Sequence, residues 1–363
     1  MNVALHVVQL LNKMMTVVAM LVFCLTTSFV HADKWAVLVE TSRYWHNYRH
    51  ASNTLGLHRM LVKNGIPESN IILLLAHDYA CDCRNAEPGT LYYAAVSRAN
   101  LYGPPHLEVD YAGEAVTGEL LLDLLTGQLS PYTPRRLRLA TSPDSNLLIF
   151  LTGHSGVDFM KFQDFKELGA DSLATALKHM HTSKGYRQLL WMADTCKAES
   201  LHQHFDMHDF LAISSSGREE NSYGNGFDNN VGVINADQFS FHSTRFLNTS
   251  SAEEKTIADY VNNFHEQHMS SNVRLRADRF PRDPSQVSLA EFMAHTDEWD
   301  DVAQVIMKRP LPLDASLPLF TLKKTTPRPT QPIRSTSGGL DFGLLFWFAC
   351  LGAAMPLLAN KLK

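Results

Sequence analysis

A cysteine and a histidine each directly follow an apolar run. Cys196 comes just after the run at 188–193 (QLLWMA), and His154 follows the run at 146–151 (NLLIFL). A thiol needs a neighbouring base to become a nucleophile in catalysis. If the two runs are adjacent parallel strands, the thiol and the imidazole lie on the same rim of a sheet. The pattern therefore predicts a Cys–His pair for nucleophilic catalysis.

The residues around this pair favour the same chemistry. Gly153 and Gly156 flank the histidine and let the backbone turn tightly, so that the N–H groups of Ser155 and Cys196 are the expected oxyanion donors. A helix predicted after Cys196, together with Lys197, would favour the thiolate. Either the cysteine or the histidine alone is more often structural, whereas the two in this arrangement point to catalysis.

The elements that must position the pair alternate along the chain. Apolar runs typical of buried strands occur at 35–40, 70–75, 146–151, 188–193 and 210–214, and helical periodicity occurs at 51–64, 117–125, 170–180 and 198–205. This alternation predicts an α/β fold, a mostly parallel sheet with helices on both faces. Functional groups of such sheets collect beyond the carboxyl ends of the strands.

Composition limits the function classes. The chain has 363 residues, 45% of them hydrophobic, and a net charge of −5. This length can bury one large core or two modest ones. No long basic run is present, so we expect no nucleic-acid partner.

Both ends of the chain indicate a secreted, tethered protein. An apolar run closing on Val30-His31-Ala32 predicts a signal peptide over 1–32, with a retained membrane anchor as the alternative. Residues 342–359 have no charge and the length of a transmembrane helix, followed by a cytosolic tail at 360–363. A removable signal for attachment of a glycosylphosphatidylinositol (GPI) anchor is the alternative for this segment.

The region between these ends divides into a domain and a stalk. Residues 33–310 form the predicted lumenal domain, and the Pro/Ser/Thr-rich residues 311–341 form an extended stalk. Asn248 begins the sequon Asn-Thr-Ser, which is compatible with glycosylation. Cys81, Cys83 and Cys196 give an odd count for an oxidising compartment, which implies a free thiol, an intermolecular bridge, or both.

Several segments together resemble the legumain-type branch of the caspase-like cysteine peptidases. They are similar, more narrowly, to the catalytic subunits of GPI-anchor transamidases. The resemblance covers about residues 33–300 and rests on the segments WAVLVETSRYWHNY (35–48), RHASNTL (49–55), NLLIFLTGHSG (146–156), FMKFQD (159–164) and Asp194-Thr195-Cys196. It implies a caspase-like fold, single-pass type I insertion in the endoplasmic reticulum membrane, and a lumenal catalytic domain.

The resemblance also implies roles for individual residues. Cys196 matches the nucleophile and His154 the general base and acid, and Asn53 matches an asparagine that orients the histidine. Cys81 matches a loop cysteine that bridges to another subunit of a membrane complex, with Cys83 as an extra thiol beside it. Lys197 stands where relatives commonly have Gln, and Ser155 stands where they often have Gly.

Two further sets of residues follow from the resemblance. Ser215 and Ser216 occupy the place where this fold lines the substrate pocket, although a strand-to-loop turn explains two serines equally well. Glu68, Glu108 and Asp110 resemble acidic positions implicated in structural calcium binding, although acidic loop residues are usually just solvated. The chemistry itself is expected to need no cofactor.

The implied activity is a transamidation. A thioester on Cys196 would form as the C-terminal GPI-attachment signal of a precursor protein is cleaved, and the amine of a GPI glycolipid would resolve it. Other subunits of the complex, precursor proteins and the glycolipid are the expected partners. The alternatives are an asparaginyl, legumain-like endopeptidase with water as acceptor, and a catalytically silent scaffold.

Overall fold

The computed structural model describes residues 33–93, 100–103 and 107–294. The predicted signal peptide, stalk, membrane helix and cytosolic tail lie outside the described residues, as does the end of the predicted catalytic domain. Within the described ranges, no helix is long and apolar enough to cross a membrane.

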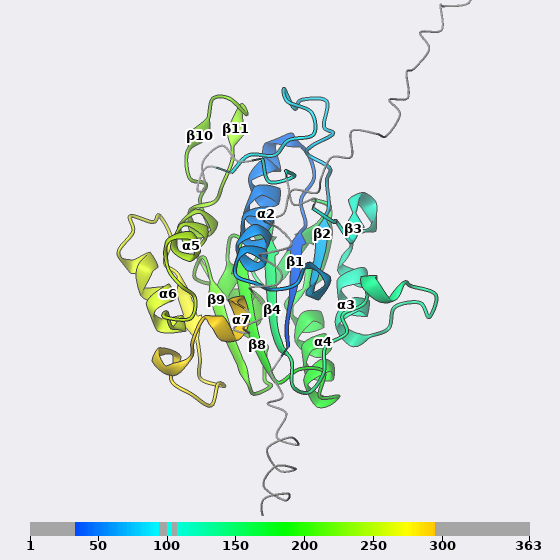
Figure 1. The fold of residues 1–363 in the computed structure, drawn as a ribbon, viewed down its shortest axis with the longest axis vertical. Helices are drawn as coiled ribbons and strands as arrows, with labels where there is room; N and C mark the ends of the chain where they lie inside the picture. Colours follow the sequence, from blue (N-terminus) through cyan, green and yellow to red (C-terminus); the bar gives the residue numbers. More distant parts are fainter. Residues whose placement is uncertain (1–32, 94–99, 104–106, 295–363) are drawn as a thin grey trace, which may run out of the picture. The chain divides into compact units, whose positions relative to one another are not determined.

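A seven-stranded sheet in the order β12-β9-β8-β4-β1-β2-β3 forms the centre of the described chain (Figure 1). All neighbouring strands are parallel except β12, which runs antiparallel to β9 at one edge. The seven strands are β1 (Lys34–Glu40), β2 (Ile71–Leu75), β3 (Tyr111–Ala112), β4 (Asn146–Thr152), β8 (Gln188–Asp194), β9 (Phe210–Ser214) and β12 (Arg274–Arg276). All five predicted strands are confirmed, and so is the α/β class with a mostly parallel sheet.

The strands read as unbroken apolar runs because both faces of the sheet are covered. Every residue of β1, β2, β4 and β9 is buried. A parallel sheet between two helical layers has no solvent-facing side, so alternation of polar residues would place polar groups in a core. Two hydrophobic clusters result, one against each face.

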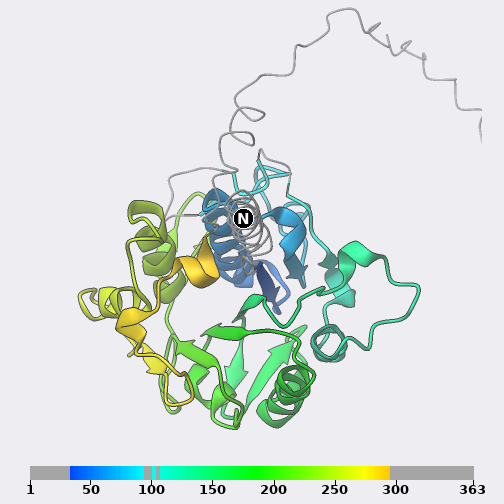
Figure 2. The ribbon, with the colours of Figure 1, turned by 60° about the horizontal axis from the view of Figure 1, so that its bottom comes forward.

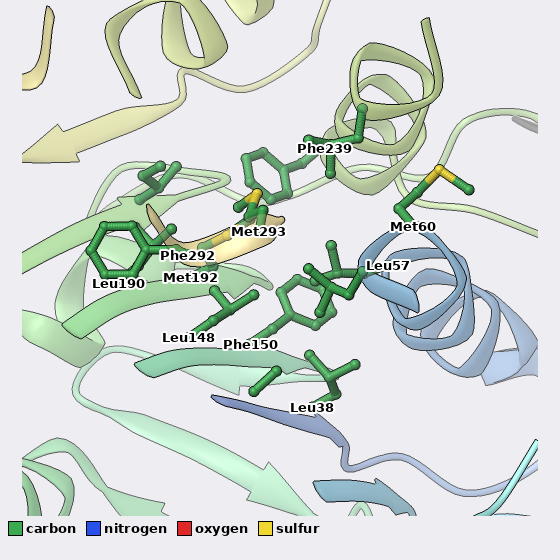
Figure 3. Packing of buried hydrophobic residues seen from close by; sticks show 14 of the residues in the cluster. Leu38, Leu57, Met60, Leu148, Phe150, Leu190, Met192, Phe239, Phe292 and Met293 are labelled. Carbon is green, nitrogen blue, oxygen red and sulfur yellow. The ribbon is translucent and has the colours of Figure 1, made fainter. Parts of the chain in front are cut away.

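Helices form the outer layers. α2 (Tyr48–Lys63), α5 (Gln238–Thr249), α6 (Ile257–His265) and α7 (Ala290–Met293) cover one face, and α3 (Gly118–Thr126) and α4 (Ala170–Thr182) cover the other (Figure 2). Leu38, Leu148 and Phe150 of the sheet meet Leu57 and Phe239 of the helices (Figure 3).

Three of the four predicted helices are confirmed as α2, α3 and α4. The helix predicted at 198–205 is wrong as an α-helix, because residues Ala198–His202 form the short 3-10 helix η6. Further 3-10 helices within the described residues are η1 (Trp45–Asn47), η2 (Glu68–Asn70), η4 (Gly113–Ala115), η5 (Arg135–Leu137) and η7 (Pro284–Gln286).

Two small antiparallel sheets complete the described fold. One consists of β5 (Ser155–Gly156), β6 (Phe159–Phe162) and β7 (Lys166–Gly169), and the other of β10 (Phe227–Asp228) and β11 (Val233–Ile234). The β5–β6–β7 sheet begins directly after His154. It therefore extends the rim of the main sheet where His154 lies.

Candidate active site

The pairing of β4 with β8 places the two predicted catalytic residues at one rim. The strands run parallel, with Thr152 opposite Asp194 at their carboxyl ends. The next residues of both strands form turns joined by a hydrogen bond from Thr195 Oγ1 to the carbonyl oxygen of Gly153, at 2.8 Å. His154 and Cys196 each follow one residue later. The sequence inference that adjacent parallel strands bring them to the same rim is confirmed.

Glycine is required immediately before the histidine. A Cβ at Gly153 would lie 2.1 Å from Thr41 Oγ1 and 3.0 Å from the Met160 side chain, and the residue has φ +153°. Any larger residue would push the turn away from the loop that follows β1. The glycine thus lets the His154 backbone pass close to that loop.

An asparagine holds the His154 ring. Asn47 Oδ1 lies 2.8 Å from His154 Nε2, and Asn47 Nδ2 donates to the carbonyl oxygen of Arg43 at 2.6 Å. Because the amide nitrogen already has a carbonyl acceptor, the oxygen is the end that faces the ring. Nε2 therefore carries the ring proton, and Nδ1 is left as the proton acceptor.

The surroundings of His154 favour its uncharged form. The ring is half-buried, and burial lowers its pKa below the ordinary histidine value, with the positive charge of Arg49 adding to the effect. The ring of His50 packs edge-on against it, with centroids 5.0 Å apart. A neutral imidazole is the form that can accept a proton as a general base.

Asn53, which the resemblance assigns to orienting the histidine, makes other contacts. Its side chain is fully buried and donates to Asp237 Oδ2 at 2.6 Å and to Thr152 Oγ1 at 3.4 Å. The direct contact to His154 belongs to Asn47 instead. Asn47 is the last residue of η1 and the N-cap residue of α2, whereas Asn53 lies within α2, so the two side chains take different directions. The expected role therefore moves from Asn53 to Asn47.

The thiol of Cys196 is half-buried at the entrance of η6. Its Sγ lies 3.9 Å from the carbonyl oxygen of Ser222. Lys197 has φ 54°, and its Nζ donates to the Glu219 carbonyl at 3.1 Å and to Asn221 Oδ1 at 2.9 Å. The expected help from a helix dipole is not available, because η6 is only five residues of 3-10 helix.

The predicted oxyanion donors, Ser155 and Cys196, are brought together at the rim. Ser155 Oγ donates to the Cys196 carbonyl and lies 2.9 Å from Thr195 Oγ1. Ser155 lies opposite Met160 in the β5–β6 pair, and a bond joins the flanking residues Lys161 and His154. In that register the Ser155 N–H points out of the ladder. Its use as an oxyanion donor stays a prediction.

Ser215 and Ser216 brace the nucleophile turn. Both are fully buried. Ser215 Oγ accepts from Thr195 N–H at 3.1 Å, and Ser216 Oγ accepts from Ala198 N–H at 3.2 Å and donates to the Thr195 carbonyl at 2.8 Å. The two hydroxyls therefore serve the strand-to-loop turn, and substrate binding at these residues stays a prediction.

A buried group of charged residues next to the pair was missed by sequence reasoning. Asp237 accepts from Arg49 Nε at 3.1 Å and lies 3.8 Å from His50 Nε2. Asp194 accepts from Ser240 Oγ at 2.6 Å. Burial raises the pKa of both carboxyls, that of Asp237 to about 7, with Asp194 as the next cause. The only sequence signal is that Arg49 and Asp194 adjoin the catalytic motifs.

The three acidic residues assigned to calcium do come together. Glu68, Glu108 and Asp110 line one cavity of about 270 Å³. Arg136 Nη1 lies 2.9 Å from Glu108 Oε1 and 2.9 Å from Asp110 Oδ1, so a guanidinium occupies the place of a cation. Among the described residues, no three metal-ligating side chains are arranged to hold an ion. A calcium ion at these residues would have to displace the Arg136 guanidinium, and calcium binding stays a prediction.

The remaining predicted sites are on the surface. Cys81 and Cys83 are exposed free thiols, and a hydrogen bond with Asp78 raises the pKa of Cys81. Asn248 lies exposed in the last turn of α5, where its Oδ1 accepts from Lys63 Nζ at 2.8 Å. Bridging and glycosylation at these positions stay predictions.

A cysteine and a histidine that follow adjacent strands of a mostly parallel sheet, with the imidazole held by an amide, define a thiol-dependent acyl-transfer or peptidase site. The chain belongs to the Peptidase C13 family, whose model matches residues 34–286. All residues of the site described above fall within that range.

Relatives of known name are similar over the same region. A protein named GPI-anchor transamidase from Schizosaccharomyces pombe is 39% identical over 267 residues, 73% of this chain and 70% of that protein. Proteins of the same name from Saccharomyces cerevisiae and Sus scrofa are 38% and 37% identical and cover 73% and 77% of this chain, and 64% and 71% of their own lengths.

Among solved structures, caspase-1 from Spodoptera frugiperda matches with a TM-score of 0.41 and 10% sequence identity, covering 73% of this chain and 92% of that chain. The fold class given above rests on the strand order and pairing of the sheet itself.

Proposed function

We propose that this chain is the thiol subunit of a GPI-anchor transamidase. It cleaves the C-terminal GPI-attachment signal of precursor proteins and joins the new carboxyl end to the ethanolamine amine of a GPI glycolipid. The observation that carries the proposal is the Cys196–His154 rim in a member of the Peptidase C13 family. Relatives at 37–39% identity that share the family carry the transamidase name.

The first half-reaction forms a thioester. His154 Nδ1 accepts the thiol proton while Cys196 Sγ attacks the carbonyl carbon of the residue at the cleavage site. The backbone N–H groups of Ser155 and Cys196 stabilise the oxyanion. As the intermediate collapses, the amide C–N bond breaks, and the imidazolium gives its proton to the departing amine of the signal segment.

The second half-reaction reverses these roles. The glycolipid amine attacks the thioester carbonyl, His154 accepts a proton from it, and the C–S bond breaks. The proton then returns to the Cys196 sulfur, and an amide replaces the acid that water would give. Water is far more concentrated than the glycolipid, so the site must hold the amine in place and exclude water.

We also propose a cellular setting for this chain, the membrane of the endoplasmic reticulum. It acts as a single-pass type I protein of the endoplasmic reticulum membrane with its catalytic domain in the lumen, and Cys81 bridges to another subunit of the complex. The reaction needs no cofactor, because Cys196 and His154 provide the nucleophile and the base. Calcium at Glu68, Glu108 and Asp110 would be structural, and no step of the reaction is assigned to these residues.

The choice of acceptor tests the proposal. Membranes containing the full chain and its complex are given a precursor with a C-terminal GPI signal, with hydrazine as a small amine acceptor. Mass spectrometry of the new C-terminus should show a hydrazide that disappears in Cys196→Ala and persists in Cys83→Ser. A free acid with no hydrazide would mean that the chain is an endopeptidase and not a transamidase.

A further inference from the structure

The turn that follows β6 has an unusual backbone. Gln163 and Asp164 are adjacent and have φ values of 57° and 65°, although neither is glycine. Left-handed conformations cost side-chain-bearing residues of the order of 1 kcal/mol each and persist only where surrounding contacts enforce them. Such strain in a turn close to the site suggests that the turn places one of its side chains.

Gln163 provides the contacts that hold the turn. Its side chain is buried and donates from Nε2 to the carbonyl oxygens of Gly113 at 2.9 Å and Val116 at 2.8 Å. Its backbone N–H donates to the Thr41 carbonyl at 2.8 Å. With three bonds fixing its neighbour, Asp164 has little freedom to point elsewhere.

Asp164 contacts the segment that carries Asn47. One carboxylate oxygen, Oδ2, accepts from the backbone N–H of Arg43 at 2.6 Å and from Asn47 Nδ2 at 3.3 Å. The other end of the same amide, Asn47 Oδ1, faces His154 Nε2 at 2.8 Å. Asp164, Asn47 and His154 therefore form a continuous chain of contacts that ends at the imidazole, on the same rim of the sheet as Cys196.

We propose that Asp164 is a positioning residue for the reaction, which fixes the Asn47 amide so that its oxygen faces His154. The reaction in this inference rests on the proposed function, whereas its geometry rests on the contacts described above. An amide can rotate by half a turn with little change of shape. The Arg43 carbonyl and the Asp164 carboxylate both accept from the amide nitrogen and donate nothing, so together they select the orientation in which that nitrogen faces them. Asp164 also holds the Arg43 backbone N–H, so it supports this orientation both directly and through Arg43.

The selected orientation determines which ring nitrogen is the base. With the Asn47 oxygen toward Nε2, the proton resides on Nε2 and Nδ1 is free to take the thiol proton. A rotated amide would donate to Nε2 and place the proton on Nδ1, where it blocks proton transfer. The wrong tautomer is costly to enzymes that use this kind of base.

Asp164 also affects the charge of the imidazole. Its negative charge raises the pKa of His154 against the larger lowering by burial and Arg49. Loss of that charge moves the pKa lower, and a donor placed on Nε2 moves it in the same direction. Among the described residues, the charged and titratable groups that act on His154 are His46, Arg49, His50, Lys161 and Asp164.

The test compares Asp164→Asn with Glu167→Gln in the full chain within its membrane complex. Both changes remove one carboxylate charge, and Glu167 is exposed on β7. The hydrazide rate should fall about 10- to 100-fold in Asp164→Asn and stay near wild type in Glu167→Gln. Asp164→Glu, which restores an acceptor, should recover part of the rate.

A second readout follows His154 without any substrate. Diethyl pyrocarbonate modifies neutral imidazole, so the pH dependence of its reaction at the His154 peptide, measured by mass spectrometry, reports the pKa of that residue. The midpoint should move to lower pH in Asp164→Asn and stay in place in Glu167→Gln. Thermal unfolding of both variants verifies that they are folded.

The outcomes separate the two proposals. An unchanged hydrazide rate in Asp164→Asn, or a fall in rate with no shift of the His154 midpoint, would overturn the positioning role. If the wild-type complex forms no hydrazide but Asp164→Asn still shifts the His154 midpoint, the transamidase proposal fails and the positioning of His154 by Asp164 stands.

Discussion

Asn47 and Asn53 lie on one segment of chain, and the structure predicts opposite consequences for their removal. Asn47→Ala deletes the acceptor 2.8 Å from His154 Nε2. That bond strengthens when the ring becomes an imidazolium in the transition state, and hydrogen bonds to charged groups contribute roughly 1.5–3 kcal/mol. The rate of hydrazide formation should therefore fall by about 10- to 150-fold.

Asn53→Ala should instead destabilise the fold. Asn53 donates to the Asp237 carboxylate at 2.6 Å and accepts from the Asp237 N–H at 3.0 Å, and both residues are buried. Each buried group left without its partner costs about 1–3 kcal/mol, which gives roughly 2–6 kcal/mol in total. The unfolding temperature should fall by several degrees or more.

Both variants are measured by the same two assays, the hydrazide rate at a temperature where each is folded and the thermal unfolding midpoint. The orienting role of Asn47 requires the larger loss of rate in Asn47→Ala and the larger loss of stability in Asn53→Ala. A larger loss of rate in folded Asn53→Ala would refute it and return the orienting role to Asn53.

Three further predictions concern the turn, the acidic cavity and a buried histidine. Gly153→Ala introduces a methyl that collides with the hydroxyl 2.1 Å away, so the hydrazide should be lost while Cys196 is still present. Arg136→Ala leaves two carboxylates unneutralised and should lower the unfolding temperature by a few degrees, about 1 kcal/mol, with Arg135→Ala, an exposed neighbour, as the control. An unchanged melting curve in Arg136→Ala would contradict the assigned ion pairs. Burial lowers the pKa of His202 to about 4, below its unfolded value, so its contribution to stability is full above pH 6.5 and is lost as the pH falls toward 4. When the pH is lowered from 6.5 to 4.5, the free energy of unfolding should therefore fall in both proteins, but by roughly 2 kcal/mol less in His202→Asn than in the wild type. Equal falls, measured by urea titration at the two pH values, would disprove the lowered pKa of His202.

The sequence predicted the framework of the fold and the central pair of the site. Runs such as 146–151 and 188–193 contain almost only apolar residues, because strands covered on both faces cannot alternate. Since parallel neighbours end at the same edge, the residues after those runs had to meet. For Cys196 and His154, local pattern and sheet topology together were sufficient.

The supporting residues could not be assigned from the sequence. Whether Asn47 or Asn53 meets the histidine depends on how η1 and α2 pack against the sheet, and one segment of chain contains both residues. The serines after β9 were expected in a pocket, but their hydroxyls turn inward to the backbone of the nucleophile turn. Contacts of this kind join residues far apart in the chain, and no local periodicity encodes them.

The sequence by itself determined the strand runs, the glycine turn and the identity of the thiol and the imidazole, because these depend on neighbours along the chain. The tertiary structure alone decided which amide holds His154, how Asp164 reaches that amide and why Arg136 lies between two carboxylates. Hydrogen bonds and ion pairs act over about 3 Å, so they are fixed only when packing has set each helix and turn in place.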